Sequence, residues 1–190
     1  MTILILGLVI FLGVHSVSIA NPRWRASVVA RHGEKMWQGV FALASLVGFV
    51  LIVWGYGLAR EDPMGLYSPP IWLRHFALLL LLFVFPLLFA AYLPGRIQDM
   101  TKHPMLAAVK LWAFAHLLVN GNLADVLLFG SLLVWAVVDR ISLKQRELIS
   151  IPNPIRSKYN DLIAVASGVT LYVLFVGWLH RWLIGVSPIG

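Results

Sequence analysis

The residues best suited to chemistry in this chain are its histidines, because the sequence contains six of them and no cysteine. Without thiolates, disulfides and iron–sulfur clusters are excluded, and a bound metal must rely on imidazole, carboxylate or a prosthetic group. Two histidines, His15 and His116, lie inside long apolar runs. An imidazole without a partner is costly in such a setting and commonly marks function. We therefore take His15 and His116 as the first candidates for metal ligands.

The residues around His116 strengthen this interpretation. Trp112, His116 and Asn120 recur every four residues, so on a helix they form one stripe with an aromatic ring, an imidazole and an amide. Exposing imidazole and amide groups to hydrocarbon costs on the order of a few kcal/mol. We therefore predict that this stripe faces other helices and not lipid.

His15 also lies on a mixed face, with Phe11 one turn before it and Ser18 one turn after it. His15 lies about six residues, or ~9 Å, from the predicted cytoplasmic end of the first apolar run. His116 lies about twelve residues, or ~18 Å, from the predicted cytoplasmic end of the fourth. Helix tilts near 20° absorb several ångströms, so a haem whose iron lies about 2 Å from each imidazole is compatible with the pair. The alternative is that both histidines only form hydrogen bonds to neighbouring helices.

The other four histidines are weaker candidates. His103 lies about 140° around the same helix from His116 and shares its face with Lys110, which predicts a cytoplasmic-edge position close to headgroups or to a haem propionate. His32 lies in a charged connection and is expected to be solvated. Two more lie near the predicted outer ends of apolar runs, where an amphipathic ring suits the headgroup region: His75 and His180.

Six apolar segments must position these histidines, and each is about 17 to 25 residues long, enough to cross ~30 Å of hydrocarbon as a helix. They are Thr2 to Ala20, Met36 to Leu58, Ile71 to Leu93, Pro104 to Asn120, Leu123 to Asp139, and Asn160 to Ile184. Of the 190 residues, 60% are hydrophobic and only 12% are charged, whereas soluble domains carry roughly twice that charge. We predict an all-α, polytopic membrane bundle of about six transmembrane helices, with residues 1–190 forming a single domain. The fourth and fifth segments should form an antiparallel hairpin, or else a shallow re-entrant pair.

The basic residues determine the predicted orientation. The net charge of +7 comes from Lys and Arg beside the apolar segments, which indicates a lipid surface and no nucleic-acid partner. Four basic residues follow the first segment and none precedes it: Arg23, Arg25, Arg31 and Lys35. Connections one, three and five should be cytoplasmic, which leaves both termini outside, in a bacterium the periplasm. The alternative of a signal peptide cleaved after Ala20 disagrees with this charge order.

Familiar catalytic motifs are missing from the sequence. It has no Walker loop, no Gly-x-Gly-x-x-Gly, no serine nucleophile elbow and no His-Glu-x-x-His. Asp125 and Asp139 lie near the ends of an apolar segment, so a carboxylate relay typical of proton-coupled transport is not apparent. Nucleotide hydrolysis, a Rossmann cofactor and zinc proteolysis therefore lack support.

Several short motifs occur at defined spacings: GVHS at residues 13–16, His103-Pro104, WAFAHLLVNG at 112–121, LFG at 128–130 and GVSP at 185–188. Together they resemble the NnrU family of bacterial membrane proteins over nearly the whole chain. That family is named for its association with denitrification and nitric oxide metabolism. It is also similar to the plant 15-cis-zeta-carotene isomerase, a membrane enzyme that carries haem b.

The resemblance implies haem b as the cofactor, and its axial-ligand candidates correspond to His15 and His116. Trp112, Asn120 and His103 are the further residues expected at the cofactor. The leading hypothesis is a haem b membrane protein that senses or handles a redox state or nitric oxide. Two alternatives remain: a haem-dependent cis–trans isomerase of a lipophilic polyene, and a non-catalytic membrane scaffold without a cofactor.

Overall fold

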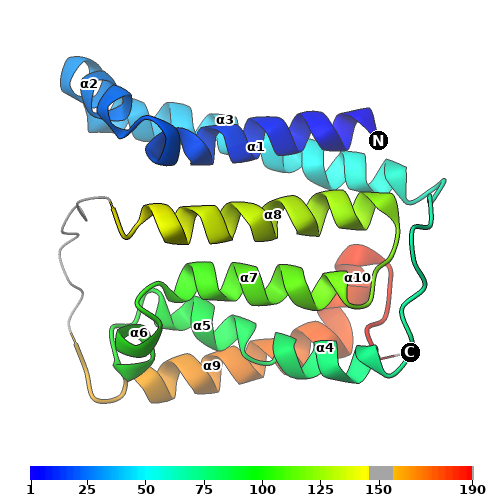
Figure 1. The fold of residues 1–190 in the computed structure, drawn as a ribbon. Helices are drawn as coiled ribbons and strands as arrows, with labels where there is room; N and C mark the ends of the chain where they lie inside the picture. The colour runs from blue at the N-terminus through cyan, green and yellow to red at the C-terminus, as the bar shows by residue number, and fades with distance from the viewer. Residues whose placement is uncertain (146–155, 190) are drawn as a thin grey trace. The chain divides into compact units, whose positions relative to one another are not determined.

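The computed structural model describes residues 1–145 and 156–189, and its elements in these ranges are helices joined by turns and irregular connections, with no strand among them (Figure 1). The helices are α1 (Thr2–Ala20), α2 (Pro22–His32), α3 (Glu34–Ala59), α4 (Leu73–Leu81), α5 (Val84–Ala90), α6 (Arg96–Thr101), α7 (Pro104–Leu117), α8 (Leu123–Ser142), α9 (Asn160–Leu174), the π-helical η1 (Phe175–Leu179) and α10 (His180–Ile184). Each of the six apolar segments predicted from the sequence is helical. The prediction of an all-α membrane bundle is thereby confirmed.

Four helical segments in the described part of the chain are long and apolar enough to cross a membrane. They are Thr2–Ala20, Glu34–Ala59, Leu73–Ala90 and Asn160–Ile184, with mean hydropathies between 2.1 and 2.5. The two remaining apolar helices differ from these. Helix α7 has only 14 residues, and α8 has 20 residues but carries an acid near each end. Large apolar side chains on the long helices, such as Leu43 and Val50 of α3, are exposed, as lipid contact requires.

The described chain forms two compact units. Unit 1 comprises Met1–Tyr67 and Gly121–Ser142, and therefore contains α1, α2, α3 and α8. Unit 2 comprises Ser68–Asn120 and Leu143–Gly190, and contains α4 to α7, α9, η1 and α10. The sequence predicted one domain and a hairpin between the fourth and fifth segments. The hairpin stays a prediction, because α7 belongs to unit 2 and α8 to unit 1.

Glycines set the packing of α1 on α3 in unit 1. A Cβ atom at Gly7 would lie 2.6 Å from the backbone nitrogen of Ile52, and one at Gly48 would lie 2.8 Å from that of Phe11. Gly55 likewise meets the backbone of Leu4. The two helices are thus antiparallel with touching backbones, the close approach that small residues permit in membranes.

A proline divides one predicted segment of unit 2 into two helices. The sequence predicted one span from Ile71 to Leu93, whereas the structure has α4 and α5 with a break at Leu82 and Phe83. Pro86 lies four residues after Leu82, where its ring excludes the helical position of the Leu82 carbonyl and its nitrogen cannot donate to it.

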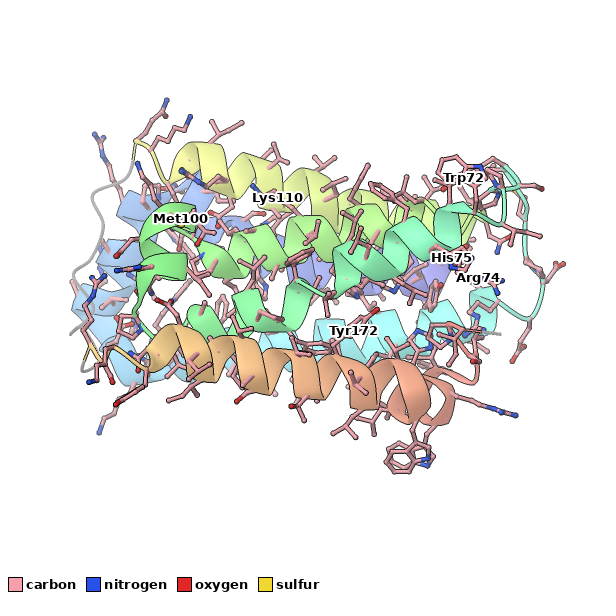
Figure 2. All side chains as sticks on the ribbon, turned by 90° about the horizontal axis from the view of Figure 1, so that it is seen from below. Trp72, Arg74, His75, Met100, Lys110 and Tyr172 are labelled. Atoms are coloured by element: carbon pink, nitrogen blue, oxygen red, sulfur yellow. The ribbon has the colours of Figure 1, made fainter. Side chains whose placement is uncertain are left out.

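The same helix pair packs on α9. A Cβ atom at Gly168 of α9 would meet the backbone of Pro86, and the Tyr172 hydroxyl donates a hydrogen bond to the Leu78 carbonyl oxygen at 2.9 Å (Figure 2). At the other end of the pair, the Asn160 amide donates to the Pro94 carbonyl oxygen at 2.9 Å. Helix α9 therefore runs antiparallel to α4 and α5.

Helix α2 lies in a region that the sequence analysis assigned to a connection. Pro22 takes the first helical position, and the Asn21 side chain caps the helix by accepting from the Trp24 amide nitrogen at 2.9 Å. Gly33, with a φ of 86°, ends α2 and begins α3. Asn21 and Gly33 thus bound a short basic helix between the two spans α1 and α3. Its charged residues suit a membrane surface.

Candidate functional site

His15 lies in α1, and a hydrogen bond along the helix fixes its tautomer. Its Nδ1 atom is 2.7 Å from the carbonyl oxygen of Phe11, one turn earlier. A carbonyl oxygen only accepts, so Nδ1 carries the proton and, in the neutral ring, Nε2 carries the lone pair. This is the arrangement in which metal-binding histidines are held, with one nitrogen donating to a carbonyl and the other available for coordination.

Aromatic rings from three helices of unit 1 surround the His15 imidazole. The Phe11 ring is stacked on it with a centroid distance of 4.2 Å, and the Phe41 ring of α3 is 4.9 Å away. Trp135 of α8 presents an edge at 5.8 Å. The imidazole is therefore half-buried among aromatic rings.

Two polar groups of these same helices are buried without a hydrogen-bond partner in the described structure. They are the indole N–H of Trp135, whose ring contacts His15, and the hydroxyl of Ser45, one turn after Phe41 on α3. A buried donor without an acceptor costs about 1–3 kcal/mol. Both donors in unit 1 therefore lack an acceptor among the residues that the structure describes.

His116 shows the same local geometry in unit 2. Its Nδ1 atom is 2.8 Å from the Trp112 carbonyl oxygen, again one turn earlier, which places the neutral lone pair on Nε2. The Trp112 ring lies 5.0 Å from the imidazole, and the Asn120 amide donates to the His116 carbonyl oxygen at 2.9 Å. The stripe predicted from the spacing is thus a connected group of half-buried side chains at the end of α7.

The structure gathers the predicted site residues into two local sets. His15 belongs to unit 1, whereas Trp112, His116, Asn120 and His103 belong to unit 2. His103 precedes Pro104 and is the N-cap residue of α7, and its backbone N–H donates to the Thr101 carbonyl oxygen at 2.7 Å. The pairing of His15 with His116 stays a prediction.

The remaining histidines lie near helix ends. His32 is the exposed last residue of α2, and His75 is exposed near the start of α4, as Figure 2 shows. His180 is half-buried, and its Nδ1 atom lies 2.7 Å from the Val186 carbonyl oxygen. The carbonyl-bound Nδ1 arrangement therefore also occurs outside the candidate pair, at His180 and, at 3.3 Å from the Val28 carbonyl oxygen, at His32.

Sequence reasoning missed a buried carboxylate in unit 1. Asp125 is only 3% exposed and accepts hydrogen bonds from the Tyr56 hydroxyl at 2.5 Å and from the Asn122 backbone N–H at 3.0 Å. Burial and the charge of Asp125 also raise the pKa of the Tyr67 phenol, which lies in the connection after α3. The available signal was the position of Asp125, the third residue of α8, where an acid bonds back to the N-cap amide.

A shallow apolar groove runs along α1 and α8 on unit 1. Its volume is about 350 Å³. It is lined by Ile5, Leu8, Val9, Leu12, Gly13, Ser16, Leu127 and Ser131. Gly13 and Ser16 flank His15 in sequence, so the groove adjoins the helix turn that carries the imidazole.

A metal bound by protein side chains alone finds no obvious site in the described residues. They contain no group of three or more His, Asp or Glu placed to hold a metal ion. A haem differs in this respect, because its porphyrin supplies four of the ligands and the protein needs to add only one or two.

Comparison with protein families identifies the chain. The model of the family described as NnrU protein matches residues 3–188, nearly the whole sequence, so the chain belongs to the NnrU family. No curated protein and no solved structure matches it significantly. The resemblance read from the sequence motifs is thereby confirmed at the level of the family.

Proposed function

We propose that this member of the NnrU family is a membrane haem protein that binds haem b with His15 and His116 as axial ligands. The observation that carries the proposal is the matching geometry of the two imidazoles, together with their place in the motifs GVHS and WAFAHLLVNG. Each lies within an apolar helix and has its Nδ1 atom within 2.8 Å of a carbonyl oxygen of its own helix, so each neutral ring has its lone pair on Nε2. Two neutral imidazoles oriented by carbonyl groups are suitable axial ligands.

The residues around His15 fit a haem. Its flat apolar macrocycle suits the aromatic surroundings provided by Phe11, Phe41 and Trp135. Its propionates are hydrogen-bond acceptors. The buried donors of Trp135 and Ser45 have no acceptor in the described structure, and a propionate would provide one. In unit 2, Trp112 and Asn120 orient His116, and His103 at the start of α7 is the residue proposed near a propionate.

Haem b, when bound, would supply an iron that changes oxidation state and that could accept a diatomic ligand after one of the two imidazoles dissociates. The carbonyl oxygens of Phe11 and Trp112 orient the two imidazoles. We propose on this basis a role in sensing or handling a redox state or nitric oxide, within the denitrification context from which the family takes its name.

A second candidate function is the cis–trans isomerisation of a lipophilic polyene. The groove along α1 and α8 favours it, because an apolar channel beside the His15 turn suits an extended hydrocarbon. The two Ser side chains of its lining, Ser16 and Ser131, are its few polar groups. Turnover of cis-polyenes by the purified protein separates this candidate from the first.

We also propose that the protein resides in the bacterial cytoplasmic membrane with both termini in the periplasm. The support is the excess of Lys and Arg in connections one, three and five. Helix α2, which contains three of these basic residues, lies within the first connection.

The proposed function is tested by the visible spectrum of protein purified from haem-sufficient cells. We expect a Soret band with sharp low-spin features on reduction, at one haem per chain. His15→Ala and His116→Ala should each lose the haem or turn it high-spin. His32→Ala is the matched control, because His32 is exposed at the end of α2, and it should keep the wild-type spectrum.

Two results would overturn the proposal. Wild-type haem content and spectrum in both His15→Ala and His116→Ala would refute the ligand assignment, and His103 and His75 would be the next pair to test. A protein that stays colourless under every condition would favour the scaffold alternative, in which both histidines act only as hydrogen-bonding groups.

A further inference from the structure

The last span of unit 2 contains a π-turn near its end. Residues Phe175–Leu179 form η1 between α9 and α10, and the His180 backbone N–H donates to the Phe175 carbonyl oxygen. Such turns are rare, occur mostly as single insertions in α-helices and are frequent at functional sites. A π-turn has more residues per turn than an α-helix. Two side chains four residues apart therefore lie more nearly above one another along the helix axis.

Trp178 and Trp182 are aligned in this way. Their rings are nearly parallel, with an interplanar angle of 16° and a centroid distance of 6.0 Å, and the residues are 62% and 69% exposed. Together with the exposed Arg181 and with Gly177, which has no side chain, they line a hollow of about 550 Å³. We refer to these four residues as the Trp–Arg hollow.

The Trp–Arg hollow lies at the level of a membrane interface. The apolar helical segment Asn160–Ile184 ends two residues after Trp182, so the hollow occupies the last turns of a span. Indole rings are enriched at this level, because one part of the ring is apolar and the N–H group can meet water or headgroups.

Basic residues lie at the end of unit 2 that carries the hollow. Arg74 and His75 lie near the start of α4, at the opposite end of unit 2 from Met100 on α6, as Figure 2 shows. Helix α9 runs antiparallel to α4, so Arg181 belongs to the same end as Arg74.

The carboxylates of unit 2 lie elsewhere. In its described part they are Asp99 and Asp161, and Asp161 is twenty residues before Arg181, or about 30 Å along the helix. Asp161 accepts hydrogen bonds from the backbone N–H groups of Arg96 and Ile97, and Asp99 pairs with Arg156. Neither carboxylate can therefore neutralise Arg181.

We propose that the Trp–Arg hollow binds the headgroup of an anionic phospholipid. The planar guanidinium of Arg181 matches the oxygens of a phosphodiester as a bidentate donor, and the two indoles pack on the glycerol and the first acyl carbons. A zwitterionic headgroup is less suited, because its cation would face Arg181, and the described part of unit 2 has no carboxylate at this end to receive it.

Native mass spectrometry of the full-length protein in detergent tests this proposal. Phosphatidylglycerol and phosphatidylcholine with identical acyl chains are titrated separately, and the lipid-bound fraction is measured. We expect several-fold more bound phosphatidylglycerol than phosphatidylcholine. Arg181→Gln should remove most of this preference, and Trp178→Ala should lower the bound fraction of phosphatidylglycerol.

Arg96→Gln is the matched control, because it removes an exposed arginine from the opposite end of unit 2, away from the hollow. It should keep the wild-type preference, and circular dichroism should show every variant folded, since substitutions of exposed residues change stability little. Unchanged phosphatidylglycerol binding in Arg181→Gln, or equal binding of both lipids by the wild type, would overturn the proposal. Displacement of the lipid by free glycerol phosphate would also contradict it, because the hollow would then bind a soluble anion.

Discussion

The Tyr56 hydroxyl donates a 2.5 Å hydrogen bond to the buried carboxylate of Asp125, which joins the end of α3 to the first turn of α8. The Asn122 backbone N–H bonds the second carboxylate oxygen. Next to it, the backbone N–H of Leu123 donates to the Met64 carbonyl oxygen at 2.8 Å. The connection after α3 is thus tied to the start of α8 by side-chain and backbone bonds within unit 1.

Tyr56→Phe should destabilise the protein by about 1–3 kcal/mol, because it leaves the buried Asp125 carboxylate without one of its donors. Reversible unfolding in mixed micelles measures the free energy of unfolding. Tyr92→Phe is the control, because Tyr92 is 69% exposed and its substitution should be nearly neutral. Equal stability of Tyr56→Phe and the wild type would show that the short hydrogen bond contributes nothing to the fold.

Gly48→Ala should destabilise the α1–α3 pair by about 1–3 kcal/mol, because the added methyl group would lie 2.8 Å from the Phe11 nitrogen and 2.9 Å from its Cβ atom. Gly57→Ala on the same helix has nothing within 4 Å of the new Cβ atom, so it should be neutral or slightly stabilising. Thermal melts in detergent compare the two variants. A stable Gly48→Ala protein would mean that α1 and α3 do not touch at their backbones.

Ser45→Ala should stabilise haem-free protein, because it removes a buried hydroxyl that has no partner within the described chain. The same substitution should lower haem retention if that hydroxyl donates to the cofactor. Ser131→Ala is the comparison, because the Ser131 hydroxyl donates to the Leu128 carbonyl oxygen at 3.1 Å. Melts of haem-free protein and haem-to-protein ratios give the two readouts, and a destabilised Ser45→Ala apoprotein with normal haem content would contradict the proposal.

Alkaline phosphatase fused after Gly190 should be active in a bacterial host, because the basic connections place both termini in the periplasm. A fusion within the first connection, after Arg31, should be inactive and serves as the internal control. Activity of the Arg31 fusion together with inactivity of the Gly190 fusion would reverse the orientation.

Hydropathy predicted the spans well because lipid imposes one strong requirement, that every backbone polar group be satisfied within the helix. The segments Thr2–Ala20 and Asn160–Ile184 therefore have the predicted bounds. The break before Pro86 follows from proline chemistry within an apolar run that hydropathy treats as continuous. The π-turn at Phe175–Leu179 left no comparable signal, because its residues are as apolar as the rest of the span.

The candidate site was predictable only in part. The spacing of Trp112, His116 and Asn120 predicted one stripe, and the structure shows these residues connected along α7. The enclosure of His15 by Phe41 and Trp135 depends on contacts between distant segments, which spacing within one helix does not contain. For the same reason the sequence marks Asp125 only as an acid near a helix end. Its hydrogen bond with Tyr56 joins residues of α8 and α3 that are far apart in the sequence.

The most direct test of the central claim is imidazole rescue of His15→Gly and His116→Gly, because it asks whether each missing side chain is itself an iron ligand. Absorption spectra of the purified, reduced proteins are recorded with and without added imidazole. We predict low-spin haem in the wild type, high-spin or depleted haem in each variant, and a return to the low-spin spectrum when imidazole fills the vacated axial position. Wild-type low-spin spectra in both variants without imidazole would contradict the assignment of His15 and His116 as the haem ligands.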